Sequence, residues 1–167
     1  MSVRRPGVKD TGLPVFSRLD PLVWEEIHKN LLEIYSGLHR EQKSLLISCD
    51  GCGDCCHFVS WGHQMWLTEV ELMVLVAEHG LREPVSKGVC PYLEGAHCLA
   101  RRGRPLGCRV FFCRGDSLVL QDLFELHFQK ILKLIRHYNL EAHYFELLEI
   151  LSLKAKECRV QPSDGSV

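Results

Sequence analysis

The sequence predicts an α-rich, irregular fold, in which amphipathic helices surround a metal-stapled, cysteine-rich loop region with minor short strands. Apolar residues recur at helical spacing before residue 45 and again after Gly115, which predicts helices at both ends. The segment 45–114 between them is rich in glycine and contains eight of the nine cysteines. Such a segment folds poorly by burial alone, so a bound metal would have to supply its cross-links.

The chain of 167 residues is long enough for one domain with its own core. We predict a single metal-binding domain over 19–158, with a cysteine cluster at 49–113 and C-terminal helices within 118–156. Residues 1–18 show little periodicity and predict a flexible N-terminal arm. The polar stretch 159–167 predicts a disordered tail.

The first predicted helix covers residues 21–44. Asp20 supplies an N-cap acceptor, and Pro21 suits the first helical position. Apolar side chains then follow at spacings of three and four residues, namely Trp24, Ile27, Leu31, Ile34 and Leu38. They predict one buried helix face.

A second helix is predicted to interrupt the cysteine-rich segment. Thr68 and Glu71, in the sequence TEVE, form a capping box. His79 would lie in the last turn, and Gly80 would end the helix. The apolar residues between these ends include Leu72, Val74, Leu75 and Val76.

Two further helices are predicted after the cysteines. The first covers about 118–138, with Asn139 as a plausible break, and the second reaches about residue 156. Their apolar stripes are Phe124, Phe128, Ile131, Ile135 and Tyr138, then Tyr144, Leu147, Leu148 and Leu151. Residues 90–93 and 108–112 are the predicted short strands.

Charge and hydrophobicity exclude several classes of partner. The net charge of -1 argues against a nucleic-acid binder or a polybasic membrane binder. No run of about 18 apolar residues predicts a membrane span, and the first residues lack the apolar stretch of a signal peptide. We therefore expect a cytoplasmic protein with no membrane and no nucleic-acid partner. Stable disulfides are rare in that compartment, so the cysteines need another role.

Cys49, Cys52 and Cys55 are each separated by two residues, a spacing that lets several sulfur atoms face one metal. Gly51 and Gly53 permit the tight turns that this needs. The same spacing opens zinc sites and iron–sulfur runs, so zinc, iron and an iron–sulfur cluster all fit. The predicted metal ligands are Cys49, Cys52, Cys55, Cys56, Cys90, Cys98, Cys108 and Cys113.

Cys55 and Cys56 are adjacent, and consecutive side chains usually diverge. We therefore predict that they face different metal sites or that one of them bridges two metals. Eight thiols match two four-coordinate sites, and a single cluster with spare thiols also fits.

Five arginines lie between Cys98 and Gly115, with no acidic residue among them. Thiolates around a dication leave negative charge, which arginine stabilises through several hydrogen bonds. Arg104 and Arg109 lie close to Cys108 and are predicted to support the site in this way. The others are predicted to form a solvated basic loop: Arg101, Arg102 and Arg114.

Other residues near the cysteines have alternative roles. Three histidines could replace a thiolate as ligand, although eight thiols already suffice: His57, His63 and His97. Trp61 and Trp66 are predicted to pack as a lid over the metal. Cys158 stands alone near the end of the last helix and is predicted not to bind metal.

The sequence CDGCGDCC matches the CxxCxxCC signature of the zinc- or iron-chelating cysteine-cluster proteins known as YkgJ-like. Further spaced motifs agree: the helix start at Thr68, the C-x-x-L from Cys90 to Leu93, and the RPxxCR box from Arg104 to Arg109. The chain thus resembles this family over about residues 49–113. The resemblance implies metal binding by the corresponding cysteines, which are Cys49, Cys52, Cys55, Cys56, Cys90, Cys98 and Cys108. Cys113 is less general in the family.

One position departs from the family pattern, because Arg101 stands where the family often has a tyrosine. Flagellin lysine methylases share a similar cysteine signature, which raises an enzymatic alternative. No glycine-rich nucleotide loop after a strand accompanies it in this chain.

Three functions follow from these observations. The first is binding of zinc or iron through one or two cysteine-thiolate sites. The second is an iron–sulfur-dependent modifying or redox enzyme. The third is a metal-free thiol redox sensor, which needs exposed thiols of low pKa.

Overall fold

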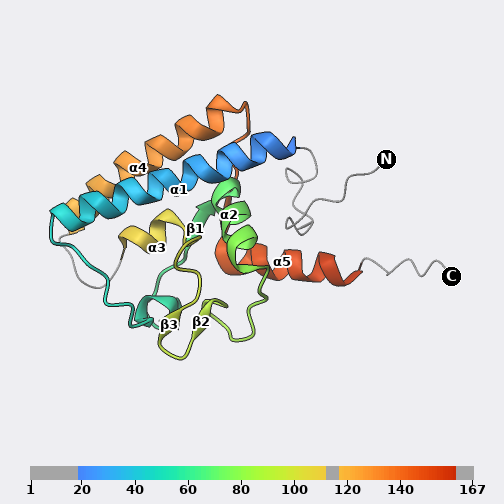
Figure 1. Ribbon diagram of the computed structural model, residues 1–167. Coiled ribbons are helices and arrows are strands. Elements are labelled where there is room, and N and C mark those ends of the chain that lie inside the picture. The colour runs from blue at the N-terminus through green and yellow to red at the C-terminus, as the bar shows by residue number, and fades with distance from the viewer. Residues whose placement is uncertain (1–18, 112–116, 161–167) are drawn as a thin grey trace.

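Two long helices lie side by side and form one layer of the molecule (Figure 1). The structure, a computed structural model, describes residues 19–111 and 117–160, without the side chains of Ser117 and of 158–160. Helix α1 (Pro21–Ser44) packs antiparallel against α4 (Ser117–His137). The predicted arm 1–18, the tail beyond Val160 and the segment 112–116 lie outside the described residues.

The ends of both long helices confirm their predicted signals. The Asp20 side chain accepts a hydrogen bond from Leu22 N at 2.8 Å, and Pro21 is the first helical residue. Asn139 has a φ of 53°, which ends α4 through a left-handed residue. The buried face of α1 consists of Trp24, Ile27, Leu31, Tyr35, Leu38 and Gln42, whereas the predicted Ile34 is half-buried.

Helix α2 (Glu69–His79) runs through the centre of the fold, and all its residues from Glu69 to Val76 are buried. Its capping box is confirmed, because Thr68 Oγ1 accepts from Glu71 N and Glu71 Oε2 accepts from Thr68 N. Gly80 follows the helix with a φ of 74°. Local sequence signals therefore fix both ends of the central helix.

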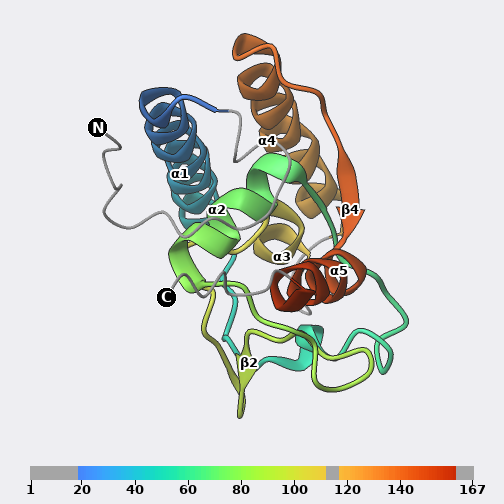
Figure 2. The same cartoon turned by 90° about the vertical axis from the view of Figure 1, so that its right-hand side faces the viewer.

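Strand β1 (Trp66–Thr68) pairs antiparallel with β4 (Tyr144–Glu146), which leads directly into α5 (Leu147–Val160). The prediction that Tyr144 belongs to the last helix is therefore wrong. Its backbone pairs with Thr68, and the helix begins three residues later, where Leu147 N donates to Met65 O. Figure 2 shows β4 descending from α4 toward α5.

The predicted strand at 108–112 is also wrong, because its described part lies mostly in helix α3 (Leu106–Val110). Leu106 and Val110 are both buried, and they lie one helical turn apart. The strand predicted at 90–93 overlaps only one residue of β2 (Leu93–Glu94). That strand pairs with β3 (His97–Cys98) in a short hairpin.

Glu71 joins three of the helices although it is only 3% exposed. Its Oε2 caps α2 at Thr68, and its Oε1 accepts from Tyr35 Oη of α1 at 3.1 Å and from Leu106 N of α3 at 2.8 Å. A buried carboxylate is tolerated when hydrogen bonds replace its water. The start of α3, and with it the RPxxC segment, is thereby fixed to the core.

The α-rich architecture with short strands is confirmed for the described residues. Helices α1, α2 and α4 lie on one side, and the mostly irregular stretches before β1 and after α2, residues 45–65 and 80–105, lie on the other (Figures 1 and 2). Within the described part of the chain, no helix combines the length and apolar character that crossing a membrane requires.

Candidate functional site

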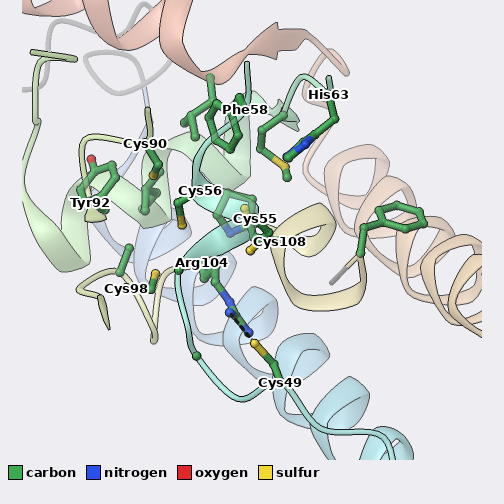
Figure 3. A pocket seen from close by; sticks show the side chains of 18 residues that line it. Cys49, Cys55, Cys56, Phe58, His63, Cys90, Tyr92, Cys98, Arg104 and Cys108 are labelled. Carbon is green, nitrogen blue, oxygen red and sulfur yellow. Dashed lines mark hydrogen bonds between the residues drawn. The ribbon is translucent and has the colours of Figure 1, made fainter. Parts of the chain in front are cut away.

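Six cysteines line one cavity below α2, at the boundary between the helical layer and the irregular segment (Figure 3). They come from the loop before α2, from the hairpin region after it and from α3: Cys49, Cys55, Cys56, Cys90, Cys98 and Cys108. The cavity measures about 30 Å³. A single water needs on the order of 10–15 Å³, so the space suits a very small group.

Glycines shape the loop that carries the first four cysteines. Gly51 and Gly53 have φ values of 73° and 80°, which confirms the predicted tight turns. A Cβ at Gly53 would lie 2.7 Å from Leu93 Cδ1, and a Cβ at Gly51 would collide with the Arg101 guanidinium. The loop therefore passes close to the β2–β3 hairpin, which brings Cys55 toward the cavity.

Backbone pairing places Cys90 beside Cys56. Cys90 N donates to Cys56 O at 2.9 Å, and an isolated bridge joins His57 to Val89. The Cys56 thiol is hydrogen-bonded to the thiols of both Cys55 and Cys90. The adjacent pair thus lines one cavity together, and whether its members bind different metals stays a prediction.

Neighbouring thiols and burial oppose thiolate formation in this cavity. A hydrogen bond with Cys56, followed by burial, raises the pKa of Cys55 well above its ordinary value. For Cys56 the bond with Cys55 lowers the pKa, but the bond with Cys90 and burial outweigh it and raise the pKa to about 12. Burial also raises the pKa of Cys108. Without a bound metal, the surroundings of these three thiols therefore favour the protonated form.

Arg104 extends into the cavity and supplies its positive charge. Its guanidinium points toward Cys49, with Nη1 4.0 Å from Sγ (Figure 3). Its electrostatic effect lowers the pKa values of Cys55 and Cys108, against the larger opposing causes. The Arg104 Nε is buried and has no hydrogen-bond partner among the described residues, so one donor is available to a group inside the cavity.

Arg109 acts on the backbone rather than on a cysteine. Its Nε donates to Arg104 O at 2.6 Å, and its guanidinium lies 3.9 Å from the centroid of the Tyr35 ring. Nη2 donates to the carbonyls of Arg101 and Arg102. Arg109 thus holds the loop that presents Arg104, a contribution to the site through the main chain.

A histidine holds the same loop from the other side. His79 Nε2 accepts from Gly103 N at 3.0 Å, and burial lowers the pKa of this histidine. The sequence suggested only that His79 lies in the last turn of α2. Its second role depends on a contact with a residue far along the chain, which no local pattern shows.

Several predicted residues lie away from the cavity. Cys52 is exposed and does not line it, and Cys113 lies outside the described residues. The exposed His57 and His97 do not line the cavity either, whereas His63 does and packs against Phe58. Arg114 and the side chain of Cys158 are also outside the described part of the chain.

The predicted tryptophan lid is wrong. Trp61 and Trp66 are 58% and 52% exposed, and neither lines the cavity. Phe58 and Met65, from the same segment, line it instead and are buried. Tyr92 lines it as well, and its hydroxyl donates to Gly80 O at 2.8 Å. The apolar wall thus comes from residues that sequence reasoning did not single out.

The donor atoms gather without forming a coordination sphere. Among the described residues, no group of three or more cysteine, histidine, aspartate or glutamate side chains stands in an arrangement that could hold a metal ion. A tetrahedral thiolate site would need changes in cysteine rotamers or in the loop. The donor set nevertheless fits a soft or borderline metal, because it consists of thiols beside one arginine.

Comparison with known proteins assigns no family to the chain. No family model matches it, and no curated protein or solved structure matches it.

Proposed function

We propose that this protein binds zinc or iron through a cysteine-thiolate site in the cavity, in a cytoplasmic, reducing environment. The observation that carries the proposal is the convergence of six cysteines from three segments on one small cavity with an arginine side chain. The CxxCxxCC resemblance supports the same function.

The ligands would come from the cavity cysteines, with Cys55, Cys56, Cys90, Cys98 and Cys108 as the central set. Cys49 lies at the edge, beside the guanidinium of Arg104. A bound zinc would cross-link the irregular segment, and a bound iron or iron–sulfur cluster would add redox chemistry. The chain's own contribution is to hold the thiols, exclude water with Phe58 and Met65, and offset negative charge through Arg104.

The pKa directions disfavour the metal-free sensor. A thiol sensor reacts as a thiolate, so it needs a lowered pKa and exposure. In the cavity the pKa values of Cys55, Cys56 and Cys108 are raised. A metal ion would reverse this preference, because it binds the thiolate and displaces the proton.

Metal and acid-labile sulfide content of the full chain, purified without oxygen, tests the proposal. We expect zinc or iron at about one or two atoms per chain. Cys56→Ser and Cys108→Ser should each lose most of the metal, whereas Cys158→Ser, outside the predicted ligand set, should retain it. Iron with sulfide would favour the enzymatic alternative. A metal-free protein with freely titratable thiols would refute the proposal.

A further inference from the structure

A second concave region lies between α1 and the loop 101–109. This groove measures about 450 Å³, within the usual range of small-molecule sites. Its charged and titratable lining residues are Tyr35, His39, Arg40, Arg102 and Arg109, and no aspartate or glutamate lines it. Since the whole chain has a net charge of -1, the groove is a local concentration of positive charge.

Arg109 forms the fixed part of the groove. Its guanidinium lies over the Tyr35 ring, and its Nε and Nη2 are tied to loop carbonyls that include that of Arg104. Its position is therefore set before any ligand arrives, which reduces the entropy lost on binding.

Arg102 and Arg40 form the adjustable rim. Arg102 Nε lies 3.1 Å from Glu78 Oε2, but the Arg102 side chain is 69% exposed. Within the described part of the chain, neither His39 nor Arg40 makes an ion pair with a carboxylate. Three arginines thus share one carboxylate partner, which leaves positive charge to be balanced.

A neighbouring basic hollow between α1 and α4 is less suited to an anion. Lys130 is one of its lining residues, and its Nζ lies 3.5 Å from Glu41 Oε1. Glu33 also lines this hollow. Carboxylates therefore already offset its charge, unlike that of the groove along the 101–109 loop.

We propose that the groove between α1 and the loop 101–109 binds a small molecule that bears two or more phosphoryl charges. Arginine guanidinium groups match phosphate oxygens in geometry and charge, and several arginines around one groove favour a multiply charged ligand over a single carboxylate. Among the described residues, the groove and the cysteine cavity have no lining residue in common.

Titration of the full, metal-replete chain with pyrophosphate tests this proposal, by calorimetry and by amide chemical shifts. We expect saturable binding that weakens with salt, with shifts concentrated in residues 32–40 and 101–109. Arg40→Gln and Arg102→Gln should each weaken binding by about tenfold or more. The matched control Arg136→Gln removes an exposed charge from α4, outside the groove, and should change binding by less than about twofold.

Three results would overturn the proposal. The first is the absence of saturable binding, with the variants' unfolding midpoints showing that they remain folded. The second is an equal loss in Arg136→Gln, or equally tight binding of orthophosphate and sulfate, because either indicates unspecific charge attraction. The third is a single-stranded oligonucleotide that binds more tightly than pyrophosphate through Arg40 and Arg102, which would assign the groove to a nucleic-acid backbone.

Discussion

The helical layer and the irregular cysteine-rich segment obtain their order in different ways. Helices α1, α2 and α4 bury continuous apolar faces, and their ends carry local caps such as Asp20 and the box at Thr68. The irregular segment has a hairpin whose strands are two residues each, an isolated bridge and a three-residue 3₁₀ helix, Asp54–Cys56. The first region is ordered by burial, and the second depends on close contacts, glycine turns and, by our proposal, a metal.

Removal of the metal should produce the largest difference in stability between the helical layer and the irregular segment. With a chelator present, amides of the segment 47–105 outside α2 should lose hydrogen-exchange protection by about 100-fold or more, as expected when a ligand in large excess over its dissociation constant is withdrawn. Amides in the middle of α1 and α4 should change far less. Equal loss in both regions would show that the metal supports the whole domain, and no loss would contradict a structural metal.

Substitution of Glu71 should destabilise the helical layer while every cysteine stays in place. Glu71→Ala leaves Tyr35 Oη and Leu106 N without their buried acceptor, so it should lower the free energy of unfolding by roughly 3 kcal/mol. Urea denaturation measures this loss. Glu33→Ala removes an exposed carboxylate from α1 as the control, and a similar cost in both variants would disprove the role of Glu71.

The Cys56 thiol makes a smaller contribution to the stability of the fold, and this contribution decreases as the pH rises. The folded-state pKa of Cys56 is about 12, raised from an ordinary 9.0, so the folded metal-free chain holds this proton more tightly than the unfolded chain. Its contribution to stability is complete below pH 9 and is lost as the pH rises toward 12. Unfolding of the metal-free chain between about pH 8 and 10.5 measures it. The free energy of unfolding should decrease less steeply with pH in Cys56→Ser than in the unchanged chain. An equal slope in both proteins would contradict the raised pKa of Cys56.

Features with local causes could be predicted from the sequence. The start of α1, the capping box of α2 and the break at Asn139 each depend on a few consecutive residues, and all three are confirmed. The glycine turns at Gly51 and Gly53 belong to the same group. Each is an intrinsic conformational preference that the rest of the fold does not override.

Features with distant causes could not be predicted. Tyr144 fits a helical stripe, but Thr68 pairs with it across the sheet and makes it a strand residue. The sequence of α3 is similar to that of a short strand. In the structure it is a helix, and Glu71 accepts a hydrogen bond from the amide of its first residue, Leu106. The role of Arg109 depends on Tyr35 of another helix. The cysteine spacing likewise indicated ligand chemistry but not which thiols share a cavity.

The β1–β4 pairing has a consequence for how the chain folds. It joins residues 66–68 to residues 144–146, and Glu69 N at the start of the central helix donates to His143 O. Contacts between such distant positions slow folding, because the intervening loop must close first. All six cavity cysteines are synthesised before β4, so a growing chain carries its complete cavity thiol set before the strand that closes the core emerges. The time before that closure is when the thiols are most exposed to oxidation and to the wrong metal.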